Sequence, residues 1–140
     1  MHKFTYERRL HWSECDAGGI IFFPHYARWM VDGLNEMFLG LGVDPNGPRE
    51  SGARGGLPVL GLTMKFHSAP ALHEMLTHQI LVTKVGGKSI GIQHRFLRDG
   101  ELLMEAEETR VWAEHPLDTP RALRTVPVPD NVRALLEPPT

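Results

Sequence analysis

A carboxylate stands in a glycine-rich loop within residues 14–26, Glu-Cys-Asp-Ala-Gly-Gly-Ile-Ile-Phe-Phe-Pro-His-Tyr. Asp16 is followed by Gly18 and Gly19, and glycine allows close backbone approach because it has no side chain. A helical pattern starts at His25, and the free N–H groups at a helix N-terminus can hold a carbonyl oxygen that gains charge. A carboxylate opposite such donors can attack that carbonyl or direct water at it. The alternative is that Asp16 only caps a turn.

One long helix is expected directly after this loop. From His25 onward, apolar residues recur at steps of three and four, which is typical of a helix with one buried stripe. The stripe comprises Tyr26, Trp29, Met30, Leu34, Met37, Phe38 and Leu41. Pro24 suits the first turn of this helix, and Gly40 or Gly42 suits its end.

Period-two alternation of apolar and polar residues predicts strands in the rest of the chain. The predicted strands are residues 3–12, 60–66, 76–85, 88–97 and 102–113. Gly86-Gly87 and Asp99-Gly100 are typical of hairpin turns, whereas the Pro/Gly-rich residues 44–56 predict a mobile loop. Prolines from residue 116 onward predict an extended tail before a short last helix over residues 131–136. The order favours an α+β fold with one helix on an antiparallel sheet, and we expect residues 1–140 to form a single domain.

Composition excludes several classes of protein. The 140 residues are 41% hydrophobic and 23% charged, as in globular chains, and the net charge of −2 argues against general affinity for nucleic acid or acidic membranes. Cys15 is the single cysteine, which excludes a disulfide or a cysteine-based zinc site within one chain. The spacing of His67, His73 and His78 matches no metal motif, so no metal is expected. With no signal-peptide pattern and no membrane-spanning apolar run, we expect a cytoplasmic protein.

Residues 16–22, Asp-Ala-Gly-Gly-Ile-Ile-Phe, resemble the D-x-x-G-[IV]-[IV]-[FYWH] loop of hot-dog thioesterases of the 4-hydroxybenzoyl-CoA thioesterase family. Residues 26–29, 88–89 and 106–112 resemble further family segments in the same order. The resemblance implies a hot-dog fold, in which an antiparallel sheet of about five strands wraps a long central helix. It also implies homodimers, often paired into homotetramers, with active sites at the subunit interface, and hydrolysis of an acyl- or aroyl-CoA thioester.

The resemblance also implies roles for individual residues. Asp16 would be the nucleophile or general base, and the backbone N–H of Phe23 would polarise the thioester carbonyl. Lys88 and Ser89 would bind coenzyme A, whose phosphate groups a lysine can neutralise. The residues that would contact the substrate are Gly19, Phe22, His25 and Tyr26. A solvated position at the helix start is the alternative for His25, and an ordinary solvated strand face is the alternative for Lys88.

Two departures from the family pattern bear on the substrate. A branch of the family that acts on short acyl-CoAs carries histidine where Phe23 stands, and the aroyl-CoA branch carries tyrosine. Phe23 keeps the ring, so we expect an aromatic acyl group such as a benzoyl-CoA derivative. The aroyl-CoA branch also has a basic cluster where this chain has Gly86-Gly87, which leaves open how the phosphates of coenzyme A are held.

Other functions remain open at this point. The alternatives are a thioesterase for acyl carrier protein or fatty acyl-CoA on the same fold, or a non-catalytic subunit that binds acyl-CoA. An acidic carrier protein would need a basic docking face, and the chain shows no strong one. No cofactor is expected, because coenzyme A is part of the substrate.

Overall fold

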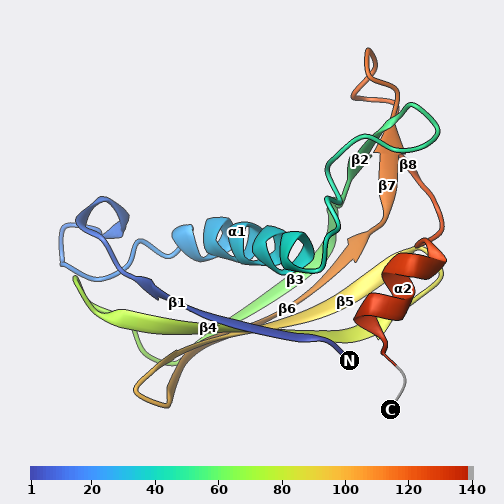
Figure 1. Cartoon of the computed structure of the whole chain (residues 1–140). Helices are drawn as coiled ribbons and strands as arrows, with labels where there is room; N and C mark the ends of the chain where they lie inside the picture. Colours follow the sequence, from blue (N-terminus) through green and yellow to red (C-terminus); the bar gives the residue numbers. More distant parts are fainter. Residues whose placement is uncertain (139–140) are drawn as a thin grey trace.

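A curved five-stranded antiparallel sheet and one long helix form the body of the protein in the computed structural model, which describes residues 1–138 (Figure 1). The strand order is β1-β4-β5-β6-β3, and every neighbouring pair is antiparallel. The strands are β1 Lys3–Arg9, β3 Val59–Phe66, β4 Met75–Val85, β5 Ser89–Arg98 and β6 Glu101–Val111. Helix α1 His25–Gly40 lies along the concave face of the sheet. The predicted α+β hot-dog architecture is therefore confirmed.

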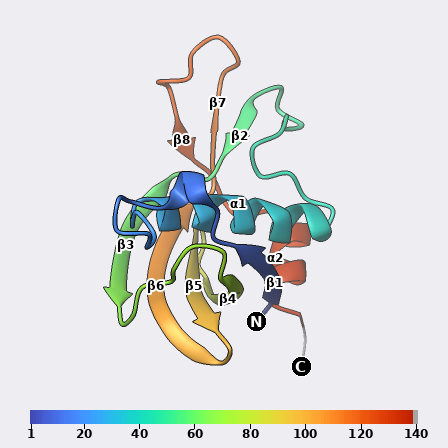
Figure 2. The same ribbon diagram turned by 90° about the vertical axis from the view of Figure 1, so that its left-hand side faces the viewer.

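Helix α1 packs its apolar stripe on the sheet, and Figure 2 shows the helix crossing over the strands. The buried residues of the helix are those that the sequence pattern predicts, while Leu41, beyond its end, is partly buried. Gly33 also faces the sheet, where a Cβ atom would lie 2.7 Å from the ring of His78. This glycine therefore allows the helix to approach β4 closely. After the helix, Gly42 adopts a φ of +79°, a conformation that favours glycine.

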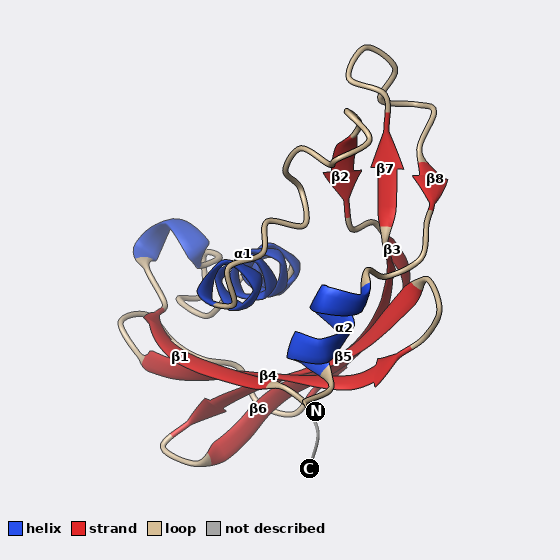
Figure 3. Ribbon diagram, turned by 45° about the vertical axis from the view of Figure 1, so that its right-hand side comes forward, coloured by secondary structure: helices blue, strands red, loops and turns tan. Residues whose placement is uncertain are grey.

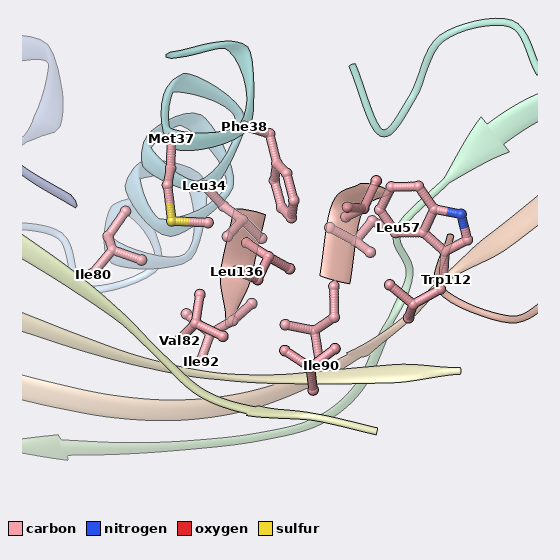
Figure 4. Close-up of a cluster of buried hydrophobic side chains, with 13 residues drawn as sticks. Leu34, Met37, Phe38, Leu57, Ile80, Val82, Ile90, Ile92, Trp112 and Leu136 are labelled. Carbon is pink, nitrogen blue, oxygen red and sulfur yellow. The ribbon is translucent and has the colours of Figure 1, made fainter. Parts of the chain in front are cut away.

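A second helix, α2 Asp130–Leu136, covers the end of the sheet that α1 leaves open (Figure 1). In the cluster drawn in Figure 4, Leu34 and Phe38 of α1 meet strand residues such as Ile80, and Leu136 of α2 joins them. Burial of one such side chain contributes roughly 1.5–3 kcal/mol, so apolar packing holds both helices on the sheet. The short last helix that the sequence predicts is confirmed.

A small three-stranded sheet is a part of the fold that the sequence patterns miss. Its strands, in the order β2-β7-β8, are β2 Arg54–Gly56, β7 Ala113–His115 and β8 Arg124–Thr125. Figure 3 shows this sheet rising at the same end of the main sheet as α2. The prediction of a loop throughout residues 44–56 is therefore wrong at β2. The predicted strand 102–113 is interrupted at Trp112, which separates β6 from β7. The backbone N–H of Trp112 donates to the Lys88 carbonyl at 2.7 Å, and its carbonyl accepts the N–H of Val126 at 2.9 Å, so its partners differ from those of β6.

The first strand ends earlier than the alternation predicts. Strand β1 stops at Arg9, and Trp12–Glu14 form a short 3-10 turn. The Glu14 carboxylate accepts the backbone N–H of His11 at 3.0 Å, which caps this turn. The prediction that the strand continues to residue 12 is wrong, because this turn takes the chain out of the sheet before Trp12.

A chain of hydrogen-bonded polar side chains crosses the inner face of the sheet beneath α1. It runs from the Tyr6 hydroxyl to His78 Nδ1 (3.2 Å), from His78 Nε2 to His94 Nδ1 (2.9 Å) and from His94 Nε2 to Glu108 (2.5 Å). Arg110 pairs with the other oxygen of Glu108. A carboxylate can only accept, so the Nε2 of His94 donates to Glu108.

The ionisation of this chain follows from its burial. Burial raises the pKa of Glu108, but the hydrogen bond from His94 and the charge of Arg110 outweigh it, and the pKa lies below its usual value. Burial, together with the positive charges that His94 and Arg8 can carry, lowers the pKa of His78 to about 2. An unfolded histidine titrates near 6.5, so below that pH the unfolded chain binds a proton at His78 that the folded chain does not.

We expect acid to destabilise the protein through His78, well above the pH at which carboxylates titrate. Between pH 7 and pH 5, this residue should lower the free energy of unfolding by about 2 kcal/mol, because the folded-state pKa lies below the unfolded value. Urea unfolding at both pH values, with wild type and His78→Gln, measures this difference. The loss should be about 2 kcal/mol smaller in His78→Gln, and an equal loss in both proteins would contradict the assignment.

Candidate active site

The loop before α1 closes on itself through backbone hydrogen bonds. Cys15 and Ile21 form an antiparallel bridge, and the Asp16 N–H donates to the Ile20 carbonyl at 2.9 Å. The Gly19 N–H donates to the Asp16 carbonyl at 3.1 Å, and Gly19 adopts a φ of +78°, which a residue with a Cβ rarely does. The glycine predicted for close backbone approach is therefore needed for the turn itself.

Asp16 caps this turn with only one of its two carboxylate oxygens. Its Oδ1 accepts the Gly18 N–H at 2.9 Å. Within residues 1–138, no hydrogen bond or ion pair engages Oδ2, and the side chain is exposed. The turn-capping alternative and a chemical role are therefore compatible, because one oxygen holds the turn and the other faces solvent.

The backbone N–H of Phe23 is a free donor just before the helix. The preceding N–H, of Phe22, donates to the Glu14 carbonyl at 2.8 Å. Pro24 is the N-cap residue of α1, and the His25 N–H donates to the Phe22 carbonyl at 3.0 Å. Among residues 1–138, no acceptor engages the Phe23 N–H. The positive end of the helix dipole adds to the attraction of this donor for an anionic oxygen.

An open cleft of about 500 Å³ brings Asp16 and the two phenylalanines together with the end of β3. Its lining residues are Asp16, Ile20, Ile21, Phe22, Phe23, Tyr26, Phe66, His67, Ser68 and Ala69. The Phe23 and Phe66 rings meet edge-on with centroids 5.9 Å apart, and Phe22 and Phe23 are 51% and 57% exposed. The cleft therefore combines aromatic walls with one carboxylate, which suits an apolar group that carries a reactive carbonyl.

The other residues predicted to contact the substrate divide between the cleft and its border. Tyr26 is buried at the base of the cleft, where burial raises the pKa of its hydroxyl. His25 packs edge-on against Phe22, with ring centroids 6.0 Å apart, and is not among the lining residues. Gly19 is not among the lining residues either, and its carbonyl accepts the Leu72 N–H at 3.0 Å. The structure thus brings Phe22 and Tyr26 into the cleft, with Gly19 and His25 beside it.

Lys88 and Ser89 lie far from this cleft in the same chain. Lys88 ends the turn between β4 and β5 and Ser89 begins β5, beyond the end of β4 that is remote from the cleft (Figure 1). Strand β4 has eleven residues and spans roughly 35 Å at about 3.3 Å per residue. Lys88 is exposed, and the Gly86 N–H donates to the Ser89 carbonyl at 2.7 Å. Within one chain, therefore, Lys88 and Ser89 do not lie near Asp16.

Sequence reasoning missed the side chains that anchor the loop. Glu14 is buried and accepts hydrogen bonds from Trp29, Arg28 and Arg8, which lie on α1 and β1. An acidic residue just before Asp16 was visible in the sequence, but its partners lie up to 15 positions away. No periodicity links residues at such different separations.

The residues described show neither a metal centre nor a transmembrane helix. Within residues 1–138, no group of three or more histidine, cysteine, aspartate or glutamate side chains is arranged to hold a metal ion. His78 belongs to the buried chain of the core, whereas His67 lines the cleft. No helix in the same range is long and apolar enough to cross a membrane.

The fold and the cleft define a hot-dog protein with a candidate site at the entry of its central helix. The chain belongs to the thioesterase-like superfamily, whose sequence pattern matches residues 10–136. It is 28% identical over 135 residues to 4-hydroxybenzoyl-CoA thioesterase from Pseudomonas sp. strain CBS-3, which covers 91% of this chain and 92% of the relative. These matches confirm the resemblance inferred from the motif and the predicted enzyme class, a thioester hydrolase.

Solved structures agree with this assignment. Gentisyl-coenzyme A thioesterase superposes with a TM-score of 0.79 and 25% identity, covering 93% of this chain and 99% of that chain. An aspartate-to-asparagine variant of 4-hydroxybenzoyl-CoA thioesterase, in complex with 4-hydroxybenzoyl-CoA, superposes with a TM-score of 0.82 and 25% identity. That match covers 96% of this chain and 99% of the other.

Proposed function

We propose that the protein hydrolyses an aroyl-CoA thioester, such as a benzoyl-CoA derivative, to the free acid and coenzyme A. One observation carries the proposal: the Asp16 carboxylate and Phe23, whose N–H has no acceptor within residues 1–138, border one open aromatic cleft. The names of similar proteins support it, since they include thioesterases for 4-hydroxybenzoyl-CoA and gentisyl-CoA.

In the proposed reaction, the thioester carbonyl lies between these two groups. The Phe23 N–H donates to the carbonyl oxygen and stabilises the negative charge that develops there. Asp16 either attacks the carbonyl carbon and expels the thiolate of coenzyme A, or takes a proton from a water molecule that attacks instead. In the first case, water then cleaves the acyl-aspartyl anhydride. Both routes yield acid and thiol with no net oxidation, so no redox cofactor is needed.

The aromatic walls of the cleft support an aromatic acyl group. Phe22, Phe23, Tyr26 and Phe66 surround the space next to Asp16. Aromatic pairs in edge-on or offset contact contribute roughly 0.5–1.5 kcal/mol beyond the burial of apolar area. A flat aroyl group would gain this contribution, whereas a short aliphatic group would not.

The position of Lys88 and Ser89 supports an oligomer with shared sites. These residues can reach coenzyme A at a cleft only if a second copy of the chain supplies them, since their own cleft is at the other end of β4. Strand β3 is a free edge of the sheet, and Leu60 and Phe66 on it are 72% and 52% exposed. Exposed apolar edge strands tend to pair with another chain, so we propose a homodimer or homotetramer. Sedimentation equilibrium tests this, and the mass of a single chain would contradict it.

Thiol release from a panel of substrates tests the proposed function. The panel comprises benzoyl-, hydroxybenzoyl-, phenylacetyl-, short acyl- and long acyl-CoA. Aroyl-CoA substrates are expected to give the highest kcat/KM. Turnover of aliphatic substrates alone would contradict the substrate class, and no turnover at all would favour a non-catalytic binding protein. The single thiol of Cys15 can react with the reagent only once per chain, so it cannot imitate turnover.

A further inference from the structure

The Glu14 side chain is the centre of a buried hydrogen-bond network beside the candidate active site. The residue is 3% exposed. Its Oε1 accepts the His11 N–H at 3.0 Å, and its Oε2 accepts the Trp29 indole N–H at 2.6 Å. Oε2 also pairs with the guanidinium groups of Arg28 and, at 3.4 Å, Arg8. Four donors from three elements therefore converge on one carboxylate.

This carboxylate is held in its charged form. Burial raises the pKa of Glu14, but the hydrogen bonds from His11, Trp29 and Arg28 and the charge of Arg8 outweigh it, so the pKa lies below its usual value. The Arg8 guanidinium also lies over the Trp29 ring, 4.2 Å from its centroid. Hydrogen bonds to charged groups are shorter and stronger than neutral ones. The network therefore holds the Glu14 carboxylate firmly against α1.

Glu14 adjoins one end of the loop in the sequence and is hydrogen-bonded to the other end. Its side chain is anchored to α1 through Trp29, and Asp16 follows two residues later. Its backbone carbonyl accepts the N–H of Phe22, the residue before Phe23. The carboxylate of Asp16 and the free N–H of Phe23 are thus both placed relative to the same helix by contacts of one residue.

We propose that Glu14 is a positioning residue for the hydrolysis: its buried carboxylate holds Asp16 and the Phe23 N–H at the separation that the reaction needs. This role rests on the proposed function. Glu14 does not line the cleft and does not touch the substrate. It acts through the loop, and loss of its charge weakens the hydrogen bonds that Trp29 and Arg28 donate to it.

Kinetics of Glu14→Gln and Trp29→Phe, singly and together, test this role. Each single variant is expected to lower kcat roughly 10- to 100-fold, because a misplacement of about 1 Å can cost 10²-fold. KM should change less than about threefold, since the walls of the cleft remain. The double variant should lose little more than either single variant, because Trp29→Phe removes the contact that Glu14→Gln weakens. Trp29→Phe keeps a ring in the core and provides a second test if Glu14→Gln folds poorly.

The matched control is Glu114→Gln, which also removes a buried charge paired with an arginine. Glu114 is 8% exposed and accepts from Arg124 at 2.7 Å, and it lies in β7 of the small sheet. This control should keep kcat. Amide hydrogen exchange gives a readout independent of turnover: exchange across residues 15–23 should accelerate in Glu14→Gln and stay unchanged in Glu114→Gln.

The outcomes separate the two proposals. A wild-type chain that is inactive on the whole substrate panel overturns the proposed function and, with it, the role of Glu14. An active wild type whose Glu14→Gln variant keeps kcat within about threefold overturns the role of Glu14 alone. A fall in kcat without faster exchange in the loop, or an equal fall in Glu114→Gln, also overturns it, because the effect is then not local positioning.

Discussion

Replacement of Asp16 by asparagine is expected to lower kcat by about 10²–10⁴-fold, the usual contribution of a general base. Asparagine keeps an acceptor for the Gly18 N–H, so the turn should persist. The change removes only the charge and the basicity of the carboxylate. Binding of an aroyl-CoA should therefore survive, and KM should stay within about threefold while turnover is lost.

Asp44 offers a close control for this experiment. It follows α1, its Oδ1 accepts the N–H of Asn46 at 3.0 Å, and its side chain is exposed, so its local geometry matches that of Asp16. It lies outside the cleft. Asp44→Asn should retain full turnover if the role of Asp16 is chemical. Turnover of Asp16→Asn within about threefold of wild type would show that Asp16 only caps the turn.

Truncation of Glu108 to alanine is expected to destabilise the protein by about 3–5 kcal/mol, the usual cost of removing one partner of a buried ion pair. The side chain is 1% exposed and accepts from both His94 and Arg110. Its removal leaves Arg110 without its carboxylate partner and the His94 N–H without an acceptor. Urea unfolding at pH 7 measures the change in the free energy of unfolding.

The neighbouring residue on the same strand is the control. Glu107 points to the opposite face of β6 and is exposed, so Glu107→Ala should change stability by less than about 0.5 kcal/mol. Glu108→Gln, which keeps an acceptor for His94, provides a milder second variant. If Glu108→Ala costs as little as Glu107→Ala, the buried chain does not stabilise the sheet.

The buried chain and the candidate site share packing contacts. The His78 ring stacks on Phe96 with centroids 4.1 Å apart, and Phe96 packs against Tyr26 at 5.0 Å. Tyr26 in turn lines the cleft. Changes at Glu108 are therefore expected to reach the cleft only through packing, and the kinetic comparison of the Glu108 variants should be made at matched stability.

The sequence by itself determined the elements whose signals are local. The periodicity from Tyr26 to Phe38, between Pro24 and Gly42, predicts α1 because the side chains of each turn lie above those of the next. Alternation and the Asp99-Gly100 turn likewise predict the main strands and their hairpins. The loop motif around Asp16 identifies the family, since its residues are contiguous.

The tertiary structure alone decided which distant residues meet. Asp16 and Phe66 share a cleft although 50 positions separate them, and His78 meets His94 and Glu108 only because of the register of β4, β5 and β6. Alternation shows which face a residue occupies, but the free energy of a buried polar group depends on its partner on the next strand. Glu14 lies close to Asp16 in the sequence, but its partners on β1 and α1 meet it only when the helix packs on the sheet.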